Sequence, residues 1–316
     1  MKNDEFPTYA VIIFSVMVFY FIAFQAPLGL GWSAGPNYEN VTVDTKVNIT
    51  QSKPVVISVN VDVEENITLT AGGTKLVNCN FTVRDYNGWA DINKTNGTFW
   101  DDVEANVGDS DDENNHYSNT NCSTVGNDGE YLSYWQCNFS IYYYANNGSD
   151  WKCNVTAIDN YYATNNNFSA SNYNTTAIIP LYALNLTQEI DFGNMAVEDT
   201  SVVSETADII NFGNMDINIS LYGFGGDDIS RISDFSGLAF VCEIGNISIG
   251  NERFSLIDQE WSLMTNLTST SDLIDGLTMP QRTAAEVINT TYWRLYVPPN
   301  PFGQCNGSIV FEAEIS

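Results

Sequence analysis

The stretch Leu76-Val-Asn-Cys-Asn-Phe-Thr-Val-Arg84 decides the fold class, because polar and apolar residues alternate along it. Successive side chains of a β-strand point to opposite faces of the sheet. Cys79 and Phe81 therefore share one face, and Asn80 and Thr82 share the other. If Cys79 points into a core, the Asn80 side chain must face solvent.

The Cys-Asn-Phe-Thr motif of this stretch returns in three close copies. They are CNFS from Cys137, CNVT from Cys153 and CNGS from Cys305, so four of the six cysteines directly precede an Asn-x-Ser/Thr tripeptide. On a strand, such a tetrad buries the sulfur and exposes the asparagine. The phase is less regular at Cys305, because Gly307 interrupts the pattern. The motif predicts a disulfide on the inner face and a candidate glycan on the outer face.

The same alternation recurs along the chain, for example in KPVVISVNVDV (53–63), YWQCNFSIYYY (134–144), DINISLYG (216–223) and GSIVFEAEIS (307–316). Turn sequences rich in Gly, Asn and Asp separate these runs, as in antiparallel sheets with one buried face. We therefore predict an all-β protein with two tandem antiparallel β-sandwich domains, immunoglobulin-like or jelly-roll-like. The predicted domains are 37–180, rich in disulfides, Tyr and Asn, and 181–316. They follow a hydrophobic leader at 1–36.

Six cysteines in an exported chain favour three disulfides, for which 15 connectivities exist. Cys242 and Cys305 are the two cysteines of the second half, so we pair them. Cys79 and Cys153 lie 74 residues apart, which is typical of an inter-sheet bridge in an immunoglobulin-like sandwich. The remaining pair, Cys122–Cys137, would close a hairpin. Zinc and redox sites are disfavoured, because the chain has no Cys-x2-Cys pair.

Asn-x-Ser/Thr sequons are dense, with 18 sites in the chain, and predict a heavily N-glycosylated exported protein. The acceptor asparagines are Asn40, Asn48, Asn66, Asn80, Asn93, Asn96, Asn121, Asn138, Asn147, Asn154, Asn167, Asn174, Asn185, Asn218, Asn246, Asn266, Asn289 and Asn306.

Residues 1–36 read as an export signal. The run from Ala10 to Phe24 is apolar except for Ser15, and a weaker apolar stretch continues to Trp32. A cleaved signal peptide and a retained membrane anchor both fit this pattern. Either one places the remainder outside the cell or on its surface, and contact with a membrane is expected only through this segment if it is retained.

Composition and the lack of known motifs disfavour nucleic-acid binding and catalysis. The chain carries 39 Asp and Glu against 11 Lys and Arg, a net charge of −28, which disfavours nucleic acid as a partner. The only histidine, His116, lies in the polar stretch DDENNHYSN and is expected in a loop. No common catalytic or phosphate-binding motif is present. We predict no catalytic residues, no cofactor and no enzymatic activity, although two opposed carboxylates of a glycosidase cannot be recognised from sequence.

The acidic stretch WDDVEANVGDSDDENN, from Trp100 to Asn115, could wrap one calcium ion, which takes six to eight oxygen ligands. The candidate ligands are Asp109, Asp111, Asp112 and Glu113, although their spacing does not match an EF-hand. A solvated acidic turn is the simpler interpretation. The tyrosines in IYYYA (141–145) and NYYAT (160–164) could bind sugars or partners, or could pack as ordinary strand residues.

Taken together, the leader, the CNFT-type motifs and the ending WRLYVPPNPFGQCNGSIVFEAEIS resemble exported immunoglobulin-like surface and filament glycoproteins of archaea. The segment VVSETADIINFGNMDINISLYG (202–223) is also similar to TasA- and camelysin-like fibre subunits. These resemblances imply a structural role and supply no catalytic residues.

We expect a non-enzymatic extracellular glycoprotein of the cell surface that assembles with identical subunits into a pilus-like filament or a surface coat. Val41–Val63 is the candidate donor for β-strand addition to a neighbour, and an ordinary first strand is the alternative for the same segment. The alternative function is an adhesin or carbohydrate-binding protein that uses loop aromatics and acidic loops.

Overall fold

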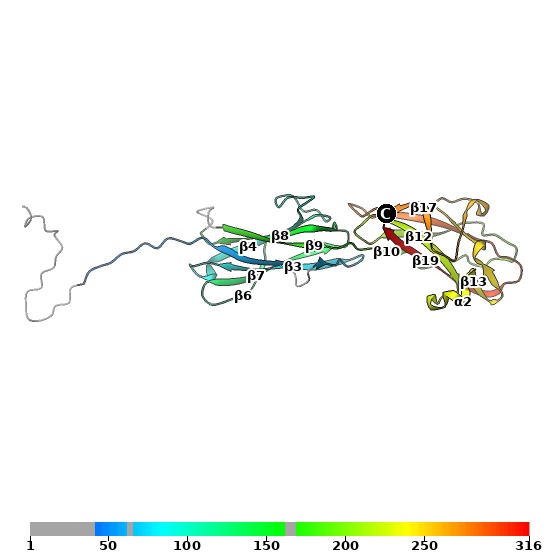
Figure 1. Ribbon diagram of the computed structural model, residues 1–316, viewed down its shortest axis with the longest axis horizontal. Coiled ribbons are helices and arrows are strands. Elements are labelled where there is room, and N and C mark those ends of the chain that lie inside the picture. The colour runs from blue at the N-terminus through cyan, green and yellow to red at the C-terminus, as the bar shows by residue number, and fades with distance from the viewer. Residues whose placement is uncertain (1–41, 62–65, 162–168, 316) are drawn as a thin grey trace, which may run out of the picture. The chain divides into compact units, whose positions relative to one another are not determined.

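The computed structural model describes residues 42–61, 66–161 and 169–315. The chain divides into two compact units, residues 1–50 and residues 51–316. Among the described residues of the first unit, 42–50, no strand or helix is formed. The strands of the second unit form four sheets, and the predicted all-β sandwich class is confirmed (Figure 1).

Two sheets built from residues 55–178 face one another. The first sheet orders its strands as β1 (Val55–Val61), β3 (Thr74–Arg84), β7 (Leu132–Tyr142) and β6 (Ser123–Asn127). The second has the order β2 (Asn66–Ile67), β9 (Ser169–Ile178), β8 (Gly148–Asp159), β4 (Ile92–Asp101) and β5 (His116–Asn119). The 3-10 turn η1 (Trp89–Asp91) precedes β4. All described pairings of these sheets are antiparallel except β2 with β9.

The core between these sheets follows the predicted alternation. Along β3, Val77, Cys79, Phe81 and Val83 are buried, and the residues between them are not. From the opposite sheet, Phe99 of β4 is fully buried, and its ring centroid lies 5.8 Å from that of Phe139 on β7. The hydrophobic contact between the two inner faces therefore sets the strand phase.

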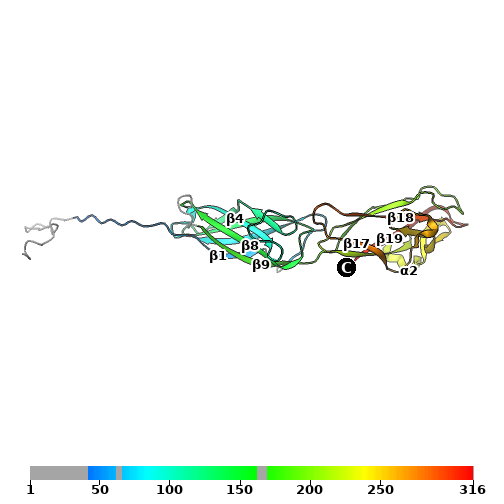
Figure 2. The ribbon, with the colours of Figure 1, turned by 90° about the horizontal axis from the view of Figure 1, so that it is seen from above.

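Strand β1 closes one side of this sandwich (Figure 2). One of its edges pairs with β3, from Val55 opposite Arg84 to Val61 opposite Cys79, with a shift of register between Val56 and Ser58. Side chains of β9 donate hydrogen bonds to backbone carbonyls of β1. Asn172 donates to the oxygen of Val56 at 3.2 Å, and Asn174 donates to the oxygen of Val59 at 2.9 Å. The candidate donor segment Val41–Val63 is thus divided: Val55–Val61 belongs to its own sandwich, and Val41, Asp62 and Val63 lie outside the described residues.

Residues 184–315 form the other two sheets. One has the order β10 (Leu184–Leu186), β11 (Glu205–Asn211), β18 (Ile288–Leu295), β15 (Glu252–Ser255) and β16 (Thr265–Asn266). The other has the order β14 (Asn246–Ser248), β13 (Leu238–Ile244), β19 (Phe302–Ile315), β12 (Ile217–Gly225) and β17 (Asp272–Met279). The short helical elements are η2 (Ile229–Arg231), α2 (Ile232–Phe235), η3 (Ile249–Asn251) and η4 (Trp261–Leu263).

The core of this second sandwich also obeys period 2. Ile217, Ile219 and Leu221 on β12 are buried against Trp293 of β18. The strands of the first two sheets end with β9 and those of the other two begin with β10, close to the predicted boundary at 180/181. Because residues 51–316 form a single compact unit, the assignment of two separate domains stays a prediction.

His116 departs from the expected polar loop. It is the first residue of β5, it lies opposite Trp100 of the neighbouring strand β4, and it is buried. Its Nδ1 lies 3.2 Å from Oδ1 of Asp111. The polar neighbours in sequence hid this strand, because β5 has only four residues and its burial is set by β4 rather than by its own pattern.

Candidate functional site

The cysteines form three disulfides, in the same pairs that the sequence analysis names: Cys79–Cys153, Cys122–Cys137 and Cys242–Cys305. The first bridge joins β3 to β8 across the two facing sheets, with its Cα atoms 6.5 Å apart. Asn80, next to Cys79, is only half-buried, and its Oδ1 accepts a hydrogen bond of 2.9 Å from Gln136. The expected inward cysteine and outward asparagine are therefore both present on β3.

Of the 18 sequon asparagines, Asn40 and Asn167 lie outside the described residues, which leaves 16. None of these 16 is buried. The buried asparagines of the described chain are Asn114, Asn211 and Asn214, and none of them belongs to a sequon. The described sequon asparagines are thus at least partly exposed, and their modification stays a prediction.

Residues 42–50, TVDTKVNIT, are all exposed and alternate in character. Val43, Val47 and Ile49 occupy one strand phase, with exposed fractions of 80, 83 and 83%. Asp44 and Lys46 belong to the opposite phase. This pattern is that of a β-strand with one apolar face, yet no described residue pairs with it.

The second sandwich has a cavity of about 470 Å³ between β15–β16 and β17. Its apolar wall includes Leu221, Phe254 and Ile274, and the exposed Leu273 lies at its rim. Two carboxylates, Asp272 and Asp275, also line it. Because β16 and β17 are the edge strands of their sheets, unpaired backbone groups border the cavity.

The acidic stretch of residues 100–115 does not gather the four candidate calcium ligands. Asp109 accepts from the backbone N–H of Asn106 at 2.8 Å, and Asp112 accepts from that of Asn114 at 2.8 Å. The other two candidates bond elsewhere: Asp111 to Ser118 at 3.0 Å, and Glu113 to the Tyr144 hydroxyl. Asp109 and Asp112 thus accept from backbone N–H groups of their own turns, as Asp side chains do in loops. Calcium at Asp109, Asp111, Asp112 and Glu113 stays a prediction.

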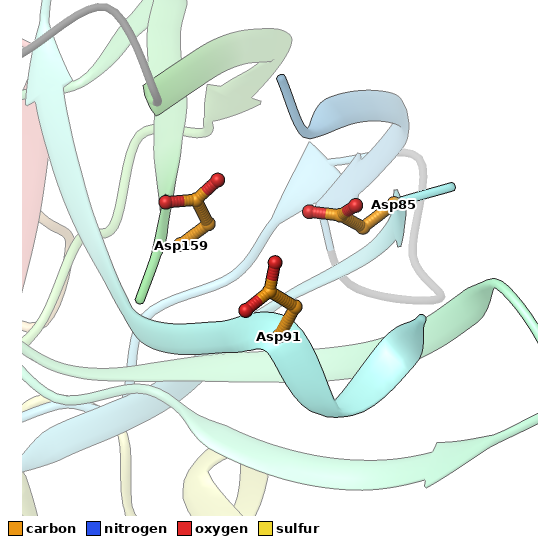
Figure 3. Close-up of side chains that lie close together, drawn as sticks. All are labelled: Asp85, Asp91 and Asp159. Carbon is orange, nitrogen blue, oxygen red and sulfur yellow. The ribbon is translucent and has the colours of Figure 1, made fainter. Parts of the chain in front are cut away.

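A different trio of carboxylates does converge (Figure 3). Asp85 directly follows β3, Asp91 ends η1, and Asp159 is the last residue of β8. One oxygen from each lies within 4.8 Å of the others, and Figure 3 shows the three carboxylates turned towards a common space. Asp85 and Asp159 are 1 and 0% exposed, and Asp91 is half-buried.

Hydrogen bonds hold these carboxylates in place. Oδ1 of Asp85 accepts from the N–H of Asn87 at 2.8 Å and from the Ser52 hydroxyl at 3.1 Å. Oδ1 of Asp159 accepts from the N–H of Tyr161 at 2.6 Å, and Asp91 accepts from the Gln51 side chain. Burial raises the pKa of Asp85. The hydrogen bonds from Asn87 and Ser52 oppose this shift, and the nearby Asp91 charge adds to it.

Sequence reasoning missed this trio, although a signal for two of its members is present. The strands joined by the Cys79–Cys153 bridge carry related heptapeptides, CNFTVRD at 79–85 and CNVTAID at 153–159, which are identical at four of seven positions. Each aspartate lies six positions after its cysteine, so alternation puts both on the same inner face. Two strands bridged at their cysteines therefore bring Asp85 and Asp159 together, and the η1 turn adds Asp91.

Exposed aromatic side chains lie at the same end of the first sandwich. Tyr86 and Tyr131 are exposed, and their rings meet edge to face with centroids 5.7 Å apart. Trp89, in η1, is also exposed. By contrast, Tyr143 and Tyr144 of the IYYYA segment are buried, so most of that segment packs inside.

No helix in the described part of the chain is long and apolar enough to cross a membrane. The expected leader at 1–36 lies outside the described residues.

No family model and no curated protein matches this sequence. Among solved structures, a chain of a chaperone–tip adhesin complex of CFA/I fimbriae is 11% identical, with 84% of each chain covered and a TM-score of 0.30. The CupB6 tip adhesin from Pseudomonas aeruginosa is also 11% identical, over 81% of this chain and 94% of that one, with a TM-score of 0.22. Likenesses at this level carry no argument about this protein, so its function must be inferred from its own residues.

Proposed function

We propose that this chain is a non-enzymatic structural glycoprotein of the cell surface, which joins identical subunits into a filament or coat by β-strand addition. The observation that carries the proposal is the segment 42–50, a strand-patterned sequence with exposed Val43, Val47 and Ile49 and no strand partner among the described residues. Such a segment gains hydrogen bonds and buries its apolar face when it joins the sheet edge of a neighbour.

The cavity of the second sandwich is the acceptor that suits this segment best. Its edge strands β16 and β17 offer unpaired backbone groups, and its apolar wall suits the valine and isoleucine side chains. A donor from one subunit and an acceptor on the next make a head-to-tail contact, which propagates as a filament when the rotation does not close a ring.

The sequons are compatible with this mode of assembly and support an extracellular setting. Asn48 occupies the polar phase of the segment, opposite Val47 and Ile49, so a glycan there would point away from the acceptor. The absence of buried sequon asparagines among the 16 described ones fits a glycosylated outer surface. The three disulfides fit an oxidising compartment, as does the exported surface class that the sequence resembles.

The experiment tests donor and acceptor separately, by electron microscopy and light scattering of the purified full chain. The double variant Val43→Asp/Val47→Asp should abolish assembly. Its matched control is Lys46→Asp, which changes the net charge by the same two units on the opposite phase and should still assemble. Assembly that survives the double variant, or wild-type material that stays monomeric, would refute strand donation.

On the acceptor side, Leu273→Asp should also block assembly. The exposed Leu263, which does not line the cavity, supplies the control Leu263→Asp. A mixture of the donor variant and the Leu273→Asp variant should stop at heterodimers, because it contains only one competent donor and one competent acceptor. Longer oligomers in that mixture would contradict the assigned acceptor.

A second candidate function is carbohydrate binding. The exposed pair Tyr86 and Tyr131, with Trp89 nearby, favours it, because exposed aromatic patches mark binding surfaces. Glycan-array binding that is lost in Tyr86→Ala and Tyr131→Ala, with assembly unchanged, would support this candidate. An array without any signal would exclude carbohydrate binding and would favour packing of these aromatic side chains between subunits.

A further inference from the structure

The carboxylates of Asp85, Asp91 and Asp159 converge on one space beside β3, η1 and β8. Their oxygens fall within 4.8 Å of one another, and two of the three side chains are buried. Carboxylates this close repel one another, and burial makes each charge more costly. Within the described chain, no Lys or Arg forms an ion pair with Asp85 or Asp91.

A second observation points to a missing partner. Asp85 is 1% exposed, and its Oδ2 has no hydrogen-bond partner. Buried polar atoms are normally satisfied by protein, water or an ion. In Figure 3 this carboxylate is turned towards Asp91 and Asp159, while its Oδ1 is already fixed by Asn87 and Ser52. An acceptor that is oriented, buried and unfilled is the arrangement of a cation ligand.

We propose that Asp85, Asp91 and Asp159 bind a divalent cation, and that the cation is calcium. The ligands are all oxygens, with no Cys or His in the group, which favours calcium or magnesium over zinc or copper. Calcium tolerates irregular geometry and completes six to eight ligands with amide oxygens, carbonyls and water. The half-exposed Asp91 leaves a route for such waters, whereas magnesium demands near-octahedral ligands.

The position of the site gives the cation a structural role. It joins β3 to β8, the strands that the Cys79–Cys153 bridge also joins, six residues further along each. It also adjoins Gln51 and Ser52, whose side chains donate to Asp91 and Asp85. These two residues lie shortly before β1 in the chain, so the cation would also stabilise the start of the first sandwich. The cation site itself does not depend on the proposed assembly.

Isothermal titration calorimetry on the chelator-treated full chain tests the proposal with CaCl₂ and MgCl₂. Wild type should bind one calcium ion at this site more tightly than magnesium. Asp85→Asn and Asp91→Asn should each weaken calcium binding by at least about tenfold, the scale expected when a metal site loses an important contact. Asp109→Asn, in the acidic stretch 100–115, is the matched control and should bind calcium as wild type does.

Thermal unfolding without calcium shows whether the variants fold. If Asp85→Asn does not fold, Asp91→Asn, at a half-exposed position, still tests the site. Calcium should raise the unfolding temperature of wild type and of Asp109→Asn, and should leave the two site variants unmoved. The absence of binding at millimolar calcium, unchanged affinity in both site variants, loss of binding in Asp109→Asn, or tighter magnesium binding would each overturn the assignment.

Discussion

Glu252 makes the stability of the second sandwich depend on pH. It begins β15 and shares the inner phase of that strand with Phe254, and both side chains are buried. Burial alone raises the pKa of this carboxyl to about 8, from 4.5 in the unfolded chain. The folded protein therefore keeps a proton at Glu252 that the unfolded chain releases over most of the neutral range.

The sign and size of the effect follow from proton linkage. The stability that comes from the protonated Glu252 is fully present below pH 4.5 and is lost as the pH rises towards about 8. Between these values the free energy of unfolding falls by about 1.4 kcal/mol for each pH unit. From pH 5.5 to 7.5 the loss is about 3 kcal/mol, or about 8 °C in unfolding temperature at roughly 3 °C per kcal/mol.

Glu252→Gln removes the titrating group and keeps its size. Calorimetry of both proteins at pH 5.5 and 7.5 should show the unfolding temperature of the variant rising, relative to wild type, by about 8 °C across this range. Any change in stability caused by the amide itself would shift the unfolding temperature of the variant equally at both pH values, so it cancels in the comparison. Glu243→Gln, which removes an exposed carboxylate from β13, should show a constant difference.

A difference between Glu252→Gln and wild type that stays constant within about 2 °C from pH 5.5 to 7.5 would refute the reasoning. It would mean that the carboxyl is ionised in the folded protein at both pH values. In that case water or a cation reaches the inner face of β15 and the side chain is not desolvated.

Three further outcomes are expected. Replacing both Cys79 and Cys153 by alanine opens a bridge across 74 residues and should lower the free energy of unfolding by about 4.5 kcal/mol, measured by urea denaturation. Gly97→Ala would place a methyl carbon 2.7 Å from Sγ of Cys137 on β7, and should lower the free energy of unfolding by about 1–3 kcal/mol in the same assay. Mass spectrometry of native material should find Asn138, which is exposed, glycosylated more fully than Asn174, whose Nδ2 is bound to a backbone carbonyl of β1.

Strand phase was predictable from sequence because alternation reports burial directly. The inward row on β3, from Val77 to Val83, could be read from the letters alone, and the outward place of Asn80 followed from it. Disulfide pairing required one further step, the expectation that Cys79 and Cys153 lie on facing sheets. Both properties depend on the period of the side chains and not on the exact path of the chain.

Density of charge along the sequence did not indicate which carboxylates converge in the fold. Asp109 and Asp112 are close in sequence, but each is engaged by a backbone N–H of its own turn. In contrast, 74 residues separate Asp85 from Asp159, and only the pairing of their strands brings them together. Convergence of ligands is a property of tertiary structure, so composition within a short window does not predict it.

The repeated heptapeptide links three properties that would otherwise be independent. Phe81 and Val83 of β3 are in phase with Cys79, as is Asp85 just after the strand, whereas Asn80 and Thr82 have the opposite phase. A one-residue slip between Cys79 and Asp85 would turn the aspartate outward while the bridge held the cysteine in place. The disulfide, the outward sequon and the carboxylate trio therefore depend on one strand register, and CNVTAID imposes the same condition on β8. The Cys79–Cys153 bridge fixes the two registers relative to each other, so it also determines how closely Asp85 approaches Asp159.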